Sequence, residues 1–251
     1  MTVIKPVNVL GLLSTSSLEG VYVALLNTDG VDVFDYGRLQ HIPYDEALRE
    51  KIRPLLGTCP YTPEAVAEFQ AVNRELTVFH AEIVKDYIAA NGVEVDVIGY
   101  EGINLTNYAS GGETGLLGDG KLLAELTGIR VVCNFHAADI RAGGQGAPLD
   151  PVYYNALCAD IGKPLAVVNI SGITRVTWIG SYGEMTAFDT GPGNAAIDEW
   201  VRKHGGMHMD YNGKLAITGK VNEQIVATMM RHKYFAKYPP KSTNRSEFVE
   251  K

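Results

Sequence analysis

Cysteine, basic charge and long apolar segments are all scarce in this sequence of 251 residues. The three cysteines, Cys59, Cys133 and Cys158, form an odd set without CxxC spacing, so we expect inert reduced thiols rather than a disulfide framework. The formal net charge of -7 argues against a general affinity for nucleic acid or anionic membranes, because both need a basic surface. Small molecules are therefore the favoured partners.

Segments that direct a chain to or across a membrane are also lacking. The first apolar run, Val7 to Leu13, is short and is followed by no small-x-small cleavage site, so a signal peptide is not expected. No run approaches the length of a membrane span. We therefore expect a cytoplasmic protein, and 46% hydrophobic residues allow it a large core.

The first part of the chain alternates between strand and helix signals. Val7–Leu13, Val21–Asn27 and Val31–Tyr36 are short β-rich runs that predict an antiparallel meander. A long helix should then begin with Thr62 as N-cap and end at Gly92. Two further strands, with a helix around residues 121–127 between them, complete the pattern; they are Val95–Gly99 and Ile129–Phe135.

A second meander follows, and it makes the chain look duplicated. Its strands are predicted at Leu165–Ile170, Thr174–Ile179 and Glu184–Phe188, followed by helices near residues 195–204 and 222–231. We therefore expect a first domain at 1–160 and an incomplete second domain at 161–251, with a cleft between them. The second unit ends with fewer strands than the first, so an open sheet edge with apolar surface should favour self-association or a companion chain.

Three loops have the composition of phosphate or ligand sites. The turn Ser14–Gly20 offers hydroxyl and backbone N–H groups, although a serine-rich hairpin turn explains it as well. Asp189–Asn194 stands between a strand and a helix, where glycines admit a ligand and the helix N-terminus favours an anion; a tight turn with Asn194 as N-cap is the alternative. The loop Asn169–Gly172 holds the position in the second unit that the serine turn holds in the first.

Asp139 precedes the glycine-rich loop Ala142–Pro148 and follows a predicted strand, which is where ligands gather in open α/β sheets. Most aspartates in such loops are merely solvated or capping. His204 and His208 have i, i+4 spacing, but Gly205 and Gly206 interrupt the helix, so no metal site is expected.

Five segments together are far more specific than any one loop: Gly11–Val21, Asn134–Leu149, Asn169–Ile173, Phe188–Asp198 and Pro239–Phe248. In order, they resemble the motifs GLMSGTSLDGVD, DFRxxDxAAGGQGAPL, NIGGIAN, FDTGPGNxxID and PPKSxxRxxF of the anhydro-N-acetylmuramic acid kinases. The resemblance implies an α/β fold of duplicated actin-like (ribonuclease H-like) domains with a central cleft.

The same resemblance implies a kinase that uses ATP and Mg²⁺. It would hydrolyse the 1,6-anhydro bond of anhydro-N-acetylmuramic acid and phosphorylate O6, with Asp139 as general base. Residues implied in ATP or phosphate binding are Ser14, Thr15, Ser16, Ser17, Glu19, Gly20, Asn169, Gly172, Asp189, Gly191, Gly193 and Asn194. Residues implied in substrate binding are Glu101, Gly102, Gly144 and Gln145, and no protein metal ligand is implied.

Several positions depart from the family pattern. Thr15, Ser16, Glu19 and Tyr22 replace the usual Gly, Thr, Asp and Asp of the phosphate loop. The segment Tyr100–Asn104 replaces SHGQT, and Asn134 and His136 replace Asp and Arg. The family also continues well beyond the length of this chain. An impaired homologue or fragment that binds sugar or nucleotide is therefore the alternative, while a hydrolase without ATP lacks a clearly placed second carboxylate.

Overall fold

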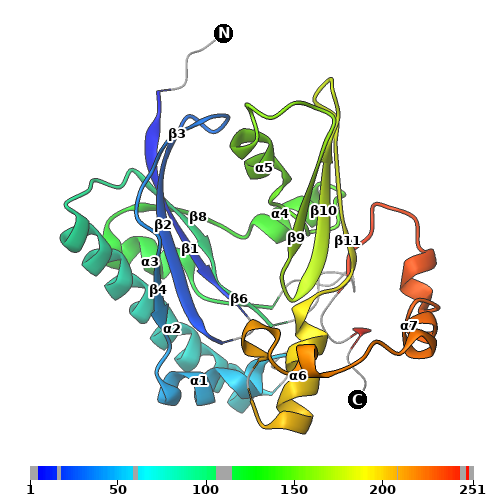
Figure 1. The fold of residues 1–251 in the computed structure, drawn as a ribbon. Coiled ribbons are helices and arrows are strands. Elements are labelled where there is room, and N and C mark those ends of the chain that lie inside the picture. Colours follow the sequence, from blue (N-terminus) through cyan, green and yellow to red (C-terminus); the bar gives the residue numbers. More distant parts are fainter. Residues whose placement is uncertain are drawn as a thin grey trace. The chain divides into compact units, whose positions relative to one another are not determined.

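The structure, a computed structural model, describes residues 5–15, 18–58, 62–105, 115–207, 209–243 and 247–248. The chain divides into two compact units, Met1–Gly146 and Ala147–Lys251. Each unit contains both strands and helices (Figure 1). The fold is therefore mixed α/β, as expected. The division falls after Gly146, earlier than the boundary expected after residue 160.

A sheet of mixed direction forms the centre of unit 1. Its strands follow the order β3-β2-β1-β5-β8, with β4 also pairing with β2. β1 and β2 form an antiparallel hairpin, whereas β5 runs parallel to both β1 and β8. The carboxyl ends of β1, β5 and β8 therefore meet at one edge. The strands are β1 (Val7–Ser14), β2 (Gly20–Thr28), β3 (Val33–Tyr36), β4 (Gln40–Pro43), β5 (Val97–Glu101) and β8 (Arg130–Cys133).

Helix α2 (Pro63–Asn91) runs beside this sheet (Figure 1). Its ends follow the sequence signals, because the Thr62 side chain accepts a hydrogen bond from Ala65 N–H and Gly92 closes the helix in the left-handed conformation. Leu76 and Val84 of α2 share one buried cluster with Leu10 of β1. Burial of these apolar side chains holds the helix against the sheet. Helices α1 (Glu46–Ile52) and α3 (Gly120–Thr127) also belong to this unit.

The end of β8 differs from the prediction. The strand ends at Cys133, Asn134 adopts a left-handed φ of 62°, and helix α4 (Phe135–Arg141) begins directly. Asp139 therefore lies on a helix rather than in a loop. A short helix next to the glycine run Gly143–Gly144 gives little periodic signal, which is why the sequence suggested a longer strand. The two-stranded ladder of β6 (Ile103–Asn104) and β7 (Leu116–Leu117) lies between β5 and α3 in the chain.

Unit 2 contains a three-stranded antiparallel sheet in the order β11-β10-β9. The strands are β9 (Leu165–Ile170), β10 (Ile173–Ile179) and β11 (Met185–Pro192), which confirms the second meander. Helix α5 (Pro151–Leu157) contacts β10 and β11, and α6 (Asn194–Gly205) follows β11. Helix α7 (Glu223–Met229) lies further along the chain, with the short 3₁₀ turn Lys233–Ala236 after it.

Two local expectations for unit 2 need correction. The residue that caps α6 is Gly193, with Asn194 as the first helical residue, so the expected cap by Asn194 is wrong. β11 extends to Pro192, so Asp189–Pro192 belong to a strand rather than to a turn. Among the described residues, no helix combines the length and the apolar character needed to cross a membrane.

Candidate active site

The turn between β1 and β2 in unit 1 is held by the core at both ends. At its start, Ser14 is buried, and its Oγ accepts a hydrogen bond from the Tyr44 hydroxyl at 2.7 Å. At its end, the side chain of Leu18 is buried, and a Cβ on Gly20 would lie 2.2 Å from the carbonyl oxygen of Ile42. The glycine at position 20 is therefore required by the close approach of β4.

The predicted phosphate-binding residues of this turn differ in accessibility. Thr15 is half-buried and Glu19 is exposed, whereas the Ser14 hydroxyl is enclosed. Among the described residues, Leu18, Asn134 and Asn212 are those other than glycine with positive φ, so Thr15 has a backbone conformation that suits a β-branched residue. Ser16 and Ser17, also predicted here, lie outside the described residues. Thr15 and Glu19 are thus the described side chains of the turn that a ligand can reach.

Asp139 and the glycine-rich loop fit closely around each other. The Asp139 Oδ2 atom accepts a hydrogen bond from Gly146 N–H at 2.7 Å, and its carbonyl oxygen accepts one from Gly144 N–H at 2.9 Å. A Cβ on Gly144 would lie 2.0 Å from Oδ2, so only glycine fits beside this carboxylate. Gln145 is exposed between the two glycines. The loop therefore fixes the half-buried carboxylate in one orientation.

Glu101, at the end of β5, contacts a residue of α4. Its Oε1 lies 3.0 Å from Nδ1 of His136 and accepts a hydrogen bond from Nδ2 of Asn104, also at 3.0 Å. Oε2 of Glu101 is buried, and no hydrogen-bond partner for it exists among the described residues. An open pocket of about 340 Å³ is lined by Glu101 together with Gly11, Gly99 and Phe135, among others. Glu101 therefore offers an acceptor oxygen beside a pocket.

Gly102, predicted in the same substrate site, has a packing role. A Cβ at this position would lie 2.2 Å from the carbonyl oxygen of Leu117. The residue is buried between β5 and β6, so its backbone is enclosed by β7. Gly102 thus shapes the segment that carries Glu101.

In unit 2, the two predicted loops bond directly to each other. The N–H groups of Gly193 and Ala195 donate to the carbonyl oxygen of Gly172, at 3.1 and 3.3 Å, and Asn194 N–H donates to that of Ser171 at 2.7 Å. The first N–H groups of α6, which commonly bind anions, are therefore already used within the chain. A Cβ on Gly193 would lie 2.2 Å from the Ser171 oxygen. The structure thus brings the two motifs together and gives Gly193 a packing reason.

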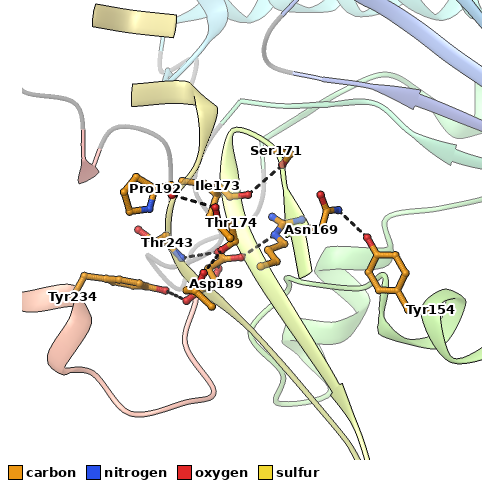
Figure 2. A network of polar contacts seen from close by, with 12 residues as sticks. Tyr154, Asn169, Ser171, Ile173, Thr174, Asp189, Pro192, Tyr234 and Thr243 are labelled. Atoms are coloured by element: carbon orange, nitrogen blue, oxygen red, sulfur yellow. Dashed lines mark hydrogen bonds and ion pairs between the residues drawn. The ribbon is translucent and has the colours of Figure 1, made fainter. Parts of the chain in front are cut away.

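Asp189 is the most enclosed of the predicted site residues (Figure 2). Its Oδ1 accepts a hydrogen bond from Arg175 Nε at 2.8 Å, and its Oδ2 accepts from Thr243 N–H at 2.9 Å and from Ser242 Oγ at 3.2 Å. The hydroxyl of Tyr234 donates to the Asp189 carbonyl oxygen at 2.7 Å. The carboxylate therefore joins β11 to β10 and to the segment 241–243.

The remaining predicted residues of unit 2 lie around the same strands. The Asn169 Nδ2 atom donates to the hydroxyl of Tyr154 on α5 at 2.7 Å, as Figure 2 shows. Gly191 is buried, and a Cβ there would lie 2.8 Å from the ring of Phe235. Both residues are thus engaged by neighbours within unit 2.

Sequence reasoning missed His80 and Arg175. His80 lies at a buried position of α2 among apolar residues, where the helical pattern alone suggests packing. Arg175 is the register partner of Asp189 on the neighbouring strand, so its role depends on strand pairing rather than on a motif. Opposite charges in an expected hairpin would have been the available signal for the second residue.

Comparison with known proteins places the chain in a family. The family model described as anhydro-N-acetylmuramic acid kinase matches residues 7–250. The chain belongs to this family. The anhydro-N-acetylmuramic acid kinase of Paramagnetospirillum magneticum is 44% identical over 242 residues, which are 95% of this chain and 66% of the relative. That of Rhodospirillum rubrum is 44% identical over 239 residues, with 95% and 63% covered, and that of Acidiphilium cryptum is 40% identical over 239 residues, with 95% and 66% covered.

The chain thus spans about two thirds of the length of these anhydro-N-acetylmuramic acid kinases. Membership of the family gives the geometry a context. Glu101 and His136, two positions at which the chain departs from the family motifs, contact each other. Because each is the other's neighbour, the two departures form one altered feature of the site.

Proposed function

We propose that this protein is an ATP-dependent kinase that acts on anhydro-N-acetylmuramic acid and yields N-acetylmuramic acid 6-phosphate. The observation that carries the proposal is the placement of Asp139. Its carboxylate lies past the carboxyl end of a parallel strand and is oriented by Gly144 and Gly146 within the family's glycine-rich motif. Ligands of open α/β sheets bind at this edge.

In this proposal, Asp139 is the general base. It accepts a proton from a water molecule that attacks the anomeric carbon, the bond from that carbon to O6 breaks, and O6 receives the phosphoryl group. The Gly146 N–H bond holds the carboxylate in place for proton transfer, which needs a base at hydrogen-bond distance from the water. Glu101 supplies an acceptor for a sugar hydroxyl or amide N–H through its buried Oε2. Gly102, Gly144 and Gln145 complete the proposed substrate residues.

ATP supplies the phosphoryl group when it is bound. Thr15 and Glu19 of the turn in unit 1 are accessible to its phosphates, and Gly20 and the buried Ser14 shape that turn. The N-terminus of α6, with Asn169, Gly172, Gly191, Gly193 and Asn194 around it, favours an anion through the helix dipole. Asp189 contributes to this site by supporting β11, since its own oxygens are engaged.

We propose that Mg²⁺ enters together with ATP and is held mainly by phosphate oxygens and water, as is common for this ion. The described residues contain no group of three or more His, Cys, Asp or Glu side chains that could hold a metal ion. The phosphate oxygens therefore have the main part in this assignment.

The strand order supports duplicated actin-like domains, the second of them incomplete. In unit 1, β1, β2 and β3 are neighbours in chain order, and β9, β10 and β11 repeat this arrangement in unit 2. Unit 1 then adds the parallel strands β5 and β8, for which the described part of unit 2 has no counterpart. The repeat of the antiparallel part is what a duplication requires.

The test is incubation of the whole chain with anhydro-N-acetylmuramic acid, Mg²⁺ and ATP labelled at the γ-phosphate, with the sugar followed by mass spectrometry. We expect labelled N-acetylmuramic acid 6-phosphate together with one ADP for each sugar. Release of ADP at the same rate without the sugar, or recovery of unphosphorylated N-acetylmuramic acid, would contradict the proposal. The first result would indicate an ATPase and the second a hydrolase.

A further inference from the structure

Four polar side chains form a continuous buried chain beneath the turn Ser14–Gly20. The Tyr44 hydroxyl donates to Ser14 Oγ at 2.7 Å, Ser14 Oγ lies 2.7 Å from His80 Nε2, and His80 Nδ1 lies 2.9 Å from the Tyr100 hydroxyl. None of the four residues has more than 3% of its surface exposed. They come from the segment before α1, from β1, from α2 and from β5. The chain of contacts therefore links four separate segments of unit 1.

His80 is neutral in this environment. Burial lowers the pKa of its imidazole to about 3, so at neutral pH the ring carries one N–H and one acceptor nitrogen. Burial also raises the pKa of Tyr44 to about 12 and raises that of Tyr100, so both hydroxyls keep their protons. Every member of the chain can therefore donate one hydrogen bond and accept another.

These protons can be arranged head to tail. Tyr44 donates to Ser14, Ser14 donates to Nε2 of His80, and the N–H on Nδ1 donates to Tyr100. In this arrangement the hydroxyl proton of Ser14 is directed into the core. The Tyr100 hydroxyl has room because position 118 is glycine, where a Cβ would lie 2.2 Å from it. Ser14 is thus anchored from below rather than offered to a ligand.

The far end of the same turn is tied to the same region. Leu18 N–H donates to the carbonyl oxygen of Thr15 at 3.1 Å, and the Leu18 carbonyl oxygen accepts from Arg49 Nε at 3.0 Å. Arg49 Nη2 also donates to the carbonyl oxygen of Tyr44, at 3.1 Å. Tyr44 therefore contacts the start of the turn through its hydroxyl and is bound to the end of the turn through Arg49.

We propose that His80 is a positioning residue for the turn that binds phosphate. Its Nε2 fixes Ser14 at the end of β1, while Tyr100 holds the ring through Nδ1, so the turn adopts one conformation before any ligand arrives. A turn ordered in advance loses less conformational freedom on binding, which strengthens binding. The link to phosphate rests on the proposed function, whereas the anchoring of the turn does not.

Amide hydrogen exchange at Leu18 tests the anchoring without any ligand. The variant is Tyr100→Phe, which removes the hydroxyl next to Nδ1, and the matched control is Tyr87→Phe. Tyr87 is equally buried, and its hydroxyl donates to the carbonyl oxygen of Arg38, outside the chain of contacts. We expect Leu18 N–H to exchange about tenfold faster in Tyr100→Phe than in the control, because a lost hydrogen bond weakens local structure by that order. Equal exchange rates in the two variants would overturn the proposal.

Two variants at position 80 keep the result decisive if Tyr100→Phe is compensated. His80→Gln retains a donor and an acceptor, whereas His80→Leu has neither. We expect exchange at Leu18, compared with that of amides in the core strands, to be faster in His80→Leu than in His80→Gln. The same order of effects in Leu18 and in the core amides would mean a general packing role and would overturn the proposal.

ATP affinity, measured by calorimetry on the same variants, separates this inference from the proposed function. We expect Tyr100→Phe to weaken ATP binding about tenfold relative to Tyr87→Phe. Faster exchange at Leu18 with unchanged ATP affinity would overturn the link to phosphate and keep the anchoring. No ATP binding by the unaltered chain would instead contradict the proposed function.

Discussion

Arg175 and Asp189 are register partners on neighbouring strands, and the guanidinium Nε donates to the fully buried carboxylate at 2.8 Å. The other carboxylate oxygen accepts hydrogen bonds from Ser242 and Thr243. A buried carboxylate without its cation is costly, because the charge has left water without compensation. This pair therefore governs the stability of the sheet in unit 2.

We predict that Arg175→Met destabilises unit 2 by about 2–3 kcal/mol, below the usual cost of breaking a buried pair because Arg175 is partly exposed and Asp189 keeps two other donors. Urea unfolding followed by tryptophan fluorescence measures unit 2 selectively, since Trp178 and Trp200 are the two tryptophans of the sequence. Arg202→Met, at an exposed pair with Glu199, is the control and should change little. Equal effects of the two substitutions would refute the prediction.

We predict that Asp139→Asn lowers phosphorylation of the sugar by about a hundred-fold to ten-thousand-fold, as expected for loss of a general base. Substrate affinity should stay within several-fold, because asparagine retains the shape of the side chain and an acceptor for Gly146 N–H. Steady-state rates and calorimetry give the two quantities. Asp160→Asn, at an exposed position, serves as the control. Wild-type turnover in Asp139→Asn would show that another group takes the proton.

We predict that stability declines as pH falls below 6.5, in part because of His80. The folded state holds this imidazole neutral with a pKa of about 3, whereas the unfolded chain protonates it near 6.5. The unfolded state therefore binds more protons between these values, and this group lowers the free energy of unfolding by up to ~1.4 kcal/mol per pH unit there. Tyr44 and Tyr100, which contact the chain, stay uncharged in this window.

Urea unfolding at several pH values, followed by circular dichroism, measures the slope for the unaltered chain and for His80→Gln. The slope between about pH 6.5 and 3 should be smaller in the variant, because the group responsible is missing. Parallel pH dependences for the two proteins would rule out a contribution from His80.

We predict that the chain self-associates through the apolar edge of unit 2. β9 pairs with β10 in the described sheet, and its other edge has no strand there, while Val168 and Ile170 are 58% and 64% exposed. Edges of this kind favour association. Light scattering should show a smaller average mass for Val168→Lys than for the unaltered chain. Val31→Lys, at an exposed position of unit 1, is the control, and a monomeric unaltered chain would contradict the prediction.

The sequence was informative wherever the signal is local. The cap at Thr62 and the stop at Gly92 determine the ends of α2 because each acts on backbone groups a few residues away. The three strands of each meander were confirmed because alternating apolar residues and turn residues lie within one short stretch. The five family motifs also lie within short segments, and the family match extends from residue 7 to residue 250.

Features that depend on contacts distant in the sequence were not predictable in this way. The partners of His80 are 66 and 20 residues away, so nothing near position 80 distinguishes it from a packed core residue. The residues that occupy the Asp189 carboxylate are 14 to 54 residues away, which is why a motif suggested a ligand where the fold has an internal clamp. The helix around Asp139 was missed because it is only one to two turns long.

Helix α2 meets two different loops with three side chains on successive turns. Asn73 accepts a hydrogen bond from Gly118 N–H, Thr77 accepts one from Asp119 N–H, and His80 contacts Ser14. A helix rises about 5.4 Å per turn, so sliding α2 by one turn would break all three contacts at once. The helix therefore works as a common rail: any displacement of the turn that begins at Ser14 is transmitted to the start of α3, and neither can be repositioned alone.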